Sequence, residues 1–187
     1  MKKGFFSARI FNSLVKSEDT TRCEKVFGYF LGPCLVYTMY SGVAGTYLTQ
    51  FYTDILGLSG ALLVWMPLVS KLFSGAAGLV IGRMIDKTRT AQGKARPWIL
   101  ASGILLAGCG ILLYTVPQAS YQVRIAWVVI SYNLFFALAF SVYSLSHSLM
   151  VPLSTRDVRQ RDSLAMLSST AISMIPGMLT TVIMPKI

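Results

Sequence analysis

One charged side chain lies in the middle of a long apolar stretch: Lys71, within residues 60–82, a segment that holds no other charged residue. In an α-helix Lys71 would lie roughly 16 Å from the start of that segment, close to its midpoint. If the segment crosses a membrane, an ammonium group at this depth must face protein or a water-filled cavity. Lys71 is therefore a candidate contact for a substrate anion, a proton or a gate. The structural alternative is hydrogen bonding to nearby carbonyl and hydroxyl groups.

Small and hydroxyl-bearing residues recur every three or four positions in three apolar segments, so each set shares one helix face. These sets either line a common polar cleft or form seams of close helix packing, and we favour a seam for the set around Ser74. The sets are Ser70, Ser74, Gly78 and Gly82; Thr38, Gly42, Thr46 and Thr49; and Asn133, Ala137, Ser141, Ser144 and Ser148. The candidate substrate-binding residues are Lys71, Thr38, Ser74, Gly78, Ser144 and Ser148.

Other reactive side chains are few. His147 is the single histidine of the chain, and it is a candidate for a proton-linked role, although a packing role is the favoured interpretation. Cys23, Cys34 and Cys109 lack metal-ligand spacing, so we expect free thiols and no metal site. The sequence contains no nucleophile, metalloprotease or phosphate-loop motif, and we expect no enzyme activity.

Long apolar segments dominate the chain, which has 187 residues and is 54% hydrophobic. Charged residues make up 13% and are bunched between these segments, which is typical of a multi-pass membrane protein. The net charge of +10 does not indicate nucleic-acid binding, because the basic residues flank apolar spans. We predict an all-α transmembrane fold with helices at about 27–50, 60–82, 98–116, 125–150 and 164–184. Short connections are expected at 52–57 and 117–121.

The distribution of Lys and Arg predicts the orientation. Six lie in the tail of residues 1–25, five in the loop around 83–96 and three in the loop around 156–161, against two on the opposite side, Arg124 and Lys186. Basic residues accumulate on the cytoplasmic side, so the tail is predicted to be cytoplasmic and the protein to lie in the cytoplasmic membrane. The tail either forms a helix on the membrane surface or is disordered. Aromatic residues near span ends, including Tyr29 and Tyr52, fit an interfacial belt.

Four motifs in order carry a family resemblance. The segments are Glu24–Tyr29, the run Phe51-Tyr52-Thr53-Asp54, the loop Asp86–Trp98, and Val151–Leu164. Together they resemble the glycoside–pentoside–hexuronide:cation symporters, the melibiose-permease-like branch of the major facilitator superfamily. The loops differ from the family pattern at Gln92 and Gln160, where Trp and Glu are usual.

The resemblance covers the first five of the family's twelve helices. It implies a sugar carrier driven by Na+, Li+ or H+ that works by alternating access between two six-helix halves. It also implies a gating role for two cytoplasmic loops, whose ion pairs would form and break across the halves in each cycle. The residues that would carry this role are Asp86, Arg89, Lys94, Arg96, Asp157 and Arg161.

The membrane-embedded site departs from the family. Ser74 and Gly78 stand where the family has two cation-binding Asp residues, and Lys71 takes the position of an Arg. Thr38 and Ser144 stand where the family has sugar-binding Asp residues. Hard cations prefer anionic oxygen ligands, so the site residues do not support Na+ coupling, and galactoside specificity does not follow from the resemblance.

These observations predict the N-terminal part of a secondary active transporter for a sugar or other small polar solute. Coupling to a cation or a proton is expected from the resemblance, with the cation-site carboxylates absent and no other cofactor. The expected partners are the lipid bilayer, a small solute, and a C-terminal half or partner subunit needed for transport, and no nucleic acid. The alternative is a non-transporting truncated or scaffold membrane protein.

Overall fold

The computed structural model describes residues 22–90, 93–155 and 157–183. Within these ranges the chain is helical apart from short connections and contains no strand, which confirms the all-α prediction. Most of the predicted basic tail, together with Arg156 and Lys186, lies outside the described residues. The elements, in which η marks a π-helix, are η3 (Glu24–Leu31), α1 (Gly32–Thr38), η4 (Met39–Tyr47), α2 (Leu48–Gln50), η5 (Phe51–Ile55), α3 (Gly60–Lys87), α4 (Arg96–Tyr114), α5 (Tyr121–Asn133), η6 (Leu134–Ala139), α6 (Phe140–Ser154) and α7 (Val158–Ile183).

Three helices of the described chain are long and apolar enough to cross a membrane: α3, α4, and the continuous helix α5–η6–α6, Tyr121–Ser154. Two predicted connections are shorter than expected. The first helical run continues through Ile55, and α6 continues through Ser154, so only residues 155–157 separate α6 from α7. Apolar length limits the part of a helix that lies in lipid, but the backbone hydrogen bonds continue beyond that limit.

The run from Glu24 to Ile55 alternates between α- and π-helical turns. Pro33 has no N–H to donate, and the preceding Gly32 donates to the carbonyl of Phe27, five residues back, as in a π-helix. A side chain at position 32 would place its Cβ 3.1 Å from that carbonyl oxygen, so glycine fits the turn. After the run, Gly57 takes a positive φ of 62° that turns the chain toward α3.

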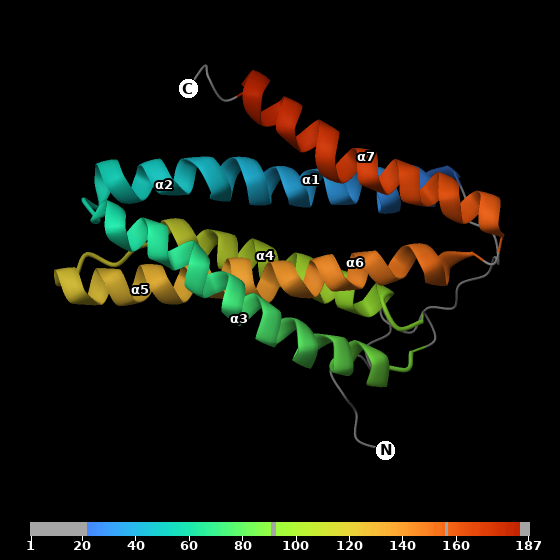
Figure 1. Cartoon of the computed structure of the whole chain (residues 1–187), viewed down its shortest axis with the longest axis horizontal. Coiled ribbons are helices and arrows are strands. Elements are labelled where there is room, and N and C mark those ends of the chain that lie inside the picture. Colours follow the sequence, from blue (N-terminus) through green and yellow to red (C-terminus); the bar gives the residue numbers. More distant parts are fainter. Residues whose placement is uncertain (1–21, 91–92, 156, 184–187) are drawn as a thin grey trace. The chain divides into compact units, whose positions relative to one another are not determined.

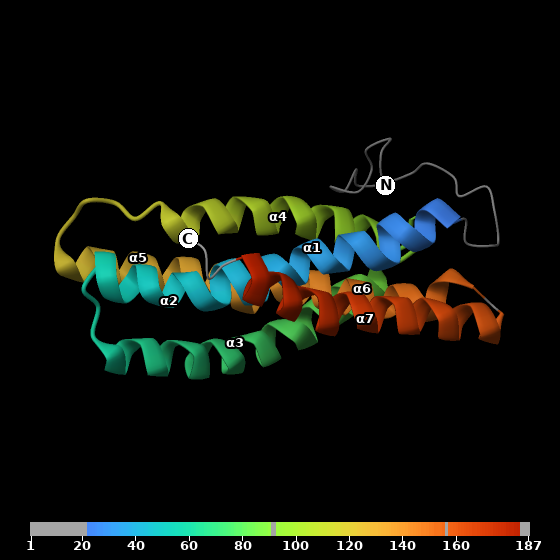
Figure 2. The same cartoon turned by 90° about the horizontal axis from the view of Figure 1, so that it is seen from above.

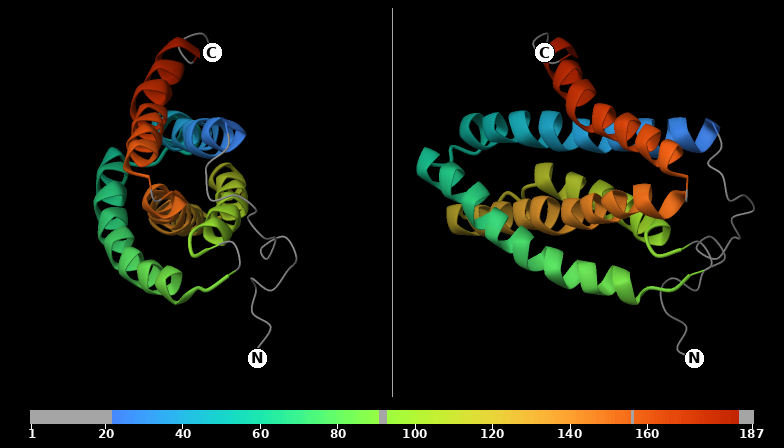
Figure 3. Two further views of the ribbon diagram at one scale, coloured as in Figure 1. Left: turned by 90° about the vertical axis from the view of Figure 1, so that its right-hand side faces the viewer. Right: turned by 45° about the vertical axis from the view of Figure 1, so that its right-hand side comes forward.

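Contacts divide the described chain into two compact units. The first contains residues 58–150, in which α4 runs beside the α5–η6–α6 helix while α3 crosses it obliquely (Figures 1 and 2). Figure 3 shows α4 and α6 end-on, next to each other. Apolar side chains of α3 and α6 form a core cluster in this unit: Ile81, Ile85 and Val142, packed against Ala77, Trp98, Leu145 and Leu149.

The second unit combines residues 22–57 with residues 151–183. Here α7 packs against η3, α1 and η4, so that segments more than 100 residues apart in sequence lie side by side (Figure 1). The Tyr29 hydroxyl forms a hydrogen bond with that of Ser154 within this unit. Tyr29 and Tyr52, which were expected in an interfacial belt, are 2% and 1% exposed, so both rings pack inside the unit. Sequence position near a span end does not distinguish a ring that faces lipid from one that packs inside.

Candidate functional site

Lys71 lies in α3 and is exposed. Eleven residues separate it from the start of α3 and sixteen from the end, or roughly 16 and 24 Å along the axis. Within the described part of the chain, Lys71 has no ion pair and no side-chain hydrogen bond. The structure thus places the predicted lone cation on an exposed helix face, where no group of the described residues neutralises it.

Ser74, one turn from Lys71, forms a hydrogen bond with Ser141 of α6, with 2.8 Å between the two Oγ atoms. Ser74 is half-buried and Ser141 is 8% exposed. In an apolar environment such a bond contributes about 0.6 kcal/mol on average and at most about 1.7 kcal/mol. Ser74 therefore joins α3 to α6, which supports the seam interpretation for Ser74.

Gly78 lies one turn further along α3, where a Cβ would be 3.8 Å from Cδ1 of Leu145 in α6. That distance is an ordinary van der Waals contact, so the backbone at Gly78 lies against the Leu145 side chain. Ser74 and Gly78 therefore belong to the same contact between α3 and α6.

The candidates on α6, Ser144, Ser148 and His147, have polar or ring contacts within their own helix. Ser144 is half-buried, and Ser148 is exposed with its hydroxyl donating to the carbonyl of Ser144 at 2.8 Å. His147 is 4% exposed, and its ring stacks parallel to Tyr143 of the same helix, with 5.8 Å between ring centroids. This stacking agrees with the packing interpretation of His147, and its proton-linked role stays a prediction.

Thr38 belongs to the other compact unit, at the end of α1. Its hydroxyl donates to the carbonyl of Cys34, one turn earlier, at 2.7 Å. A threonine hydroxyl bonded to its own helix still has a free acceptor site, so Thr38 can accept a hydrogen bond from a solute.

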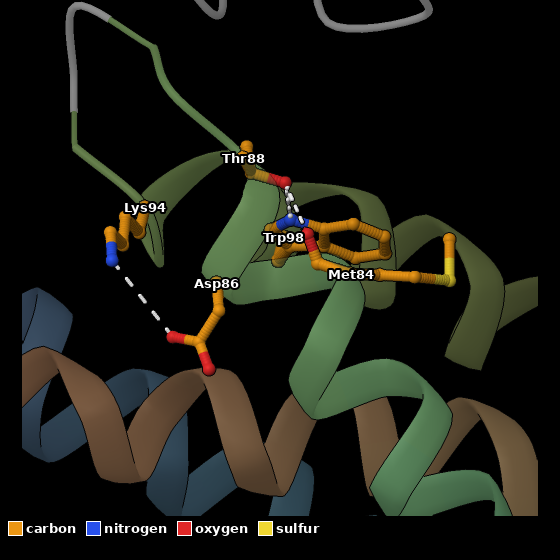
Figure 4. A network of polar contacts seen from close by, with 5 residues as sticks. All are labelled: Met84, Asp86, Thr88, Lys94 and Trp98. Carbon is orange, nitrogen blue, oxygen red and sulfur yellow. Dashed lines mark hydrogen bonds and ion pairs between the residues drawn. The ribbon is translucent and has the colours of Figure 1, made fainter.

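The loop after α3 is closed by hydrogen bonds (Figure 4). The indole Nε1–H of Trp98 donates to the Thr88 hydroxyl at 2.9 Å, and that hydroxyl donates to the carbonyl of Met84 at 2.8 Å. Thr90 and Gly93 bond to each other twice, through the Thr90 hydroxyl and the Gly93 N–H. Gly93 has a φ of 91°, which favours glycine at this turn. These hydrogen bonds tie the end of α3 to the start of α4.

Two of the predicted gating residues form an ion pair in this loop: Lys94 Nζ lies 3.9 Å from Asp86 Oδ1 (Figure 4). The Lys94 side chain is 47% exposed and that of Asp86 is 74% exposed, so solvent screens the pair strongly. Arg89 is exposed and Arg96 half-buried, at the first position of α4. A pair as weak as Asp86–Lys94 can exchange partners at little cost.

Asp157 and Arg161, in the other unit, form the start of α7. The Asp157 carboxylate accepts the N–H of Arg159 at 3.1 Å, which makes Asp157 the N-cap of α7. The backbone N–H of Arg161 donates to the carbonyl of Asp157. Asp157 therefore has a local structural role that the sequence motif did not predict.

Two partners were missed as site residues. Ser141 belongs to the predicted polar set of its segment, but spacing within one helix does not say which member meets Ser74. The Trp98–Thr88 bond joins the two ends of a loop, and the motif gave no signal for it. Among the described residues no group of three or more His, Cys, Asp or Glu could hold a metal ion, and the three cysteines are free.

Comparison with known proteins decides the family. The family model described as MFS/sugar transport protein matches residues 28–187. The chain belongs to this family. Its members are transporters, which confirms the prediction of a transporter-type membrane protein rather than an enzyme.

Several transporters are similar to this member of the family. It is 29% identical over 170 residues to the inner membrane symporter YicJ of Escherichia coli, covering 91% of this chain and 36% of that protein. It is 28% identical over 145 residues to the isoprimeverose transporter of Lactiplantibacillus pentosus, covering 78% of this chain and 30% of that protein. The putative glycoside/cation symporter YagG of Escherichia coli is 29% identical over 117 residues, 63% of this chain and 25% of that protein. These names confirm the glycoside:cation symporter resemblance, and the chain spans about a third of the length of these relatives.

Proposed function

We propose that this chain forms the N-terminal part of a secondary active transporter that moves a sugar or other small polar solute by alternating access. The family match over residues 28–187 carries the proposal. The structure supports it with polar side chains in the middle of α3, where Lys71 lies one turn from the Ser74–Ser141 pair.

The solute chemistry of relatives narrows the choice. One relative is named an isoprimeverose transporter, and another, the putative sulfoquinovose importer of Salmonella typhimurium, is 31% identical over 121 residues. Both names denote hydroxyl-rich solutes, one neutral and one a sulfonate. A carrier for a hydroxylated solute fits the serine and threonine hydroxyls of this chain.

The remaining helices of the carrier would come from a C-terminal part, either on the same polypeptide or as a partner subunit. The relatives support this because they are about three times as long as the matched region. A solute cavity between two halves needs both walls, so the 187 residues alone would not transport.

The basic loops would face the cytoplasm and act as the gate. The charge bias of the chain supports this orientation. In one state Asp86 pairs with Lys94, as in the structure, and in another it pairs with a cation of the C-terminal part. The low strength of an exposed ion pair permits this exchange in each cycle.

Two measurements test the proposal. Mass spectrometry of material captured from native membranes through an N-terminal tag gives the size of the assembly, which we expect to exceed twice 20.5 kDa. In vesicles, this material should take up a labelled solute saturably from a panel of sugars and sugar acids, whereas the purified 187-residue chain should not. Saturable uptake by the short chain would refute the need for a second part. A native assembly that transports no member of the panel would count against the transport function.

One observation favours a second candidate, a non-transporting scaffold: the Ser74 hydroxyl already bonds to Ser141 in a helix contact. The two functions predict different behaviour at Ser144, a half-buried candidate solute contact. In a transporter, solute should slow the alkylation of a cysteine introduced by Ser144→Cys, in a background in which Cys23, Cys34 and Cys109 are changed to Ser. In a scaffold, the panel of solutes should leave that rate unchanged.

A further inference from the structure

The hydroxyl group of Thr88 has partners on two different helices. Thr88 is the C-cap residue of α3, where the backbone leaves the helix with a φ of −74° and a ψ of 126°. Its hydroxyl donates to the carbonyl of Met84 in the last turns of α3 and accepts the indole N–H of Trp98 at the start of α4 (Figure 4). One side chain therefore caps α3 and joins that end to α4. We call these two hydrogen bonds the clamp.

The ring of Trp98 gives the clamp a fixed base. It packs against the core cluster that α3 and α6 form together, in which Ile85 is fully buried. A ring that is packed in a core and also hydrogen-bonded through its N–H keeps one orientation. Thr88 is therefore held in place by the core of this unit and not by the exposed loop that follows it.

The Asp86–Lys94 ion pair is too weak to order this region by itself. Both side chains are largely exposed, and an exposed ion pair contributes no more free energy than the conformational entropy of fixing one residue costs. Residues 88–95 separate α3 from α4, so several residues must be ordered before the two charges meet. The clamp orders them from both ends, because Thr88 lies two residues after Asp86 and Trp98 four residues after Lys94.

We propose that Thr88 and Trp98 are positioning residues of the gate, whose hydrogen bond holds the carboxylate of Asp86 where it can exchange one cationic partner for another. This inference rests on the proposed transport function, in which Asp86 pairs with different cations in different states. A carboxylate on a fraying helix end would lose conformational entropy at each pairing, whereas one that is held in place is already ordered for both partners. Neither Thr88 nor Trp98 carries a charge, so each acts on transport through the position of Asp86.

Uptake of a labelled solute into vesicles by the native assembly tests this inference. Thr88→Val keeps the shape of the side chain and removes both hydrogen bonds, so the maximal uptake rate should fall about fivefold or more while the KM changes less than about twofold. Thr88→Ser keeps the hydroxyl group and should retain at least about half of the wild-type rate. Thr115→Val is the matched control and should leave the rate unchanged. Thr115 caps α4 with the same kind of bond, from its hydroxyl to the carbonyl of Ile111, at the opposite end of α4 from Trp98.

Double variants separate positioning from a general loss of stability. Trp98→Phe keeps a packed ring and removes the N–H, so adding it to Thr88→Val should slow uptake no further than Thr88→Val alone, because both changes remove the same bond. In an Asp86→Asn background, Thr88→Val should have little additional effect on uptake, since the carboxylate that the clamp holds is already gone. Multiplicative slowing by Thr88→Val and Asp86→Asn would overturn the inference. Wild-type uptake by Thr88→Val would also overturn it and would leave the transport function intact.

A cross-linking measurement on the native assembly tests the clamp without transport. Cysteines introduced by Asp86→Cys and Lys94→Cys, in a background without the native cysteines, report how often the two positions meet. Adding Thr88→Val should lower the rate of cross-linking by a short bifunctional thiol reagent about fivefold, and adding Thr115→Val should leave that rate unchanged. An unchanged rate with Thr88→Val would overturn the inference even if uptake is slowed. If the native assembly transports no solute of the panel, the transport function falls, and a lowered cross-linking rate would then still support the clamp.

Discussion

The loop after α3 and the middle of α3 differ in whether their polar groups have partners within the described chain. In the loop, the Trp98 indole, the Thr88 hydroxyl and the Met84 carbonyl form a chain of hydrogen bonds, and Asp86 pairs with Lys94 nearby. The side chains of Asp86 and Lys94 are largely exposed and would be solvated even without each other. At mid-helix, where an unpaired charge is expensive, Lys71 has no partner within the described chain.

This difference separates polar groups that are satisfied within the fold from a charged group that is not. A structural polar group in an apolar region is normally satisfied within the fold, as Ser74 is by Ser141. Lys71 does not follow this rule, although it lies one turn away. A polar group that the fold leaves open at such a depth marks a place for a ligand or a further part of the carrier.

The largest effect is expected from removing the side chain that anchors the loop. Trp98 packs against the Ile81–Ile85–Val142 cluster and also donates to Thr88. Trp98→Ala should lower the free energy of unfolding by about 2–4 kcal/mol, because it removes both the apolar contact and the hydrogen bond. Trp98→Phe should cost only about 1 kcal/mol. Denaturant titration in detergent gives the free energy of unfolding of each variant. Equal losses for Trp98→Ala and Trp98→Phe would show that packing of the ring contributes little.

The sequence predicted the class of the protein but not these contacts. Apolar length and the bunching of charge were enough for an all-α membrane protein, because the cost of exposing polar groups to lipid constrains every span. The same reasoning placed Lys71 at mid-depth and found Ser74 and Gly78 on one face. It could not predict that Ser141, rather than Ser144, meets Ser74, since helix spacing fixes a face but not the register between two helices.

The ends of elements were the weakest prediction for a related reason. Residues 52–55 and 151–154 are helical, although they lie beyond the apolar segments. Tyr29 and Tyr52 were expected in an interfacial belt, and both are buried. In both cases hydropathy reports the environment of a segment, whereas helix ends and the direction of a ring depend on hydrogen bonds and packing with distant residues.

An intermediate effect is expected at the pair that Ser74 of α3 forms with Ser141 of α6. Ser141→Ala should lower the free energy of unfolding by about 1 kcal/mol, because the Ser74 hydroxyl loses its partner in a half-buried place. The double variant Ser74→Ala with Ser141→Ala should cost less than the sum of the two single variants. A double-mutant cycle measured by unfolding gives the coupling energy, expected at about 0.5–1.5 kcal/mol. Strict additivity would mean that the two hydroxyls do not interact.

The smallest effect on stability is expected at the Asp86–Lys94 pair. Asp86→Asn should change the free energy of unfolding by less than about 0.5 kcal/mol, because both side chains are largely exposed and the pair is screened by solvent. Its effect on transport should be larger than its effect on stability, since the proposed gate uses Asp86 in two states with different partners. Uptake rates of the native assembly and of the variant, measured at equal protein in the same vesicles, give this comparison. Lys94→Gln is the matched variant: it removes the local pair but leaves Asp86 free for the other state, so it should slow uptake less than Asp86→Asn. Equal slowing by both would mean that the local pair, and not an exchange of partners, is what transport requires.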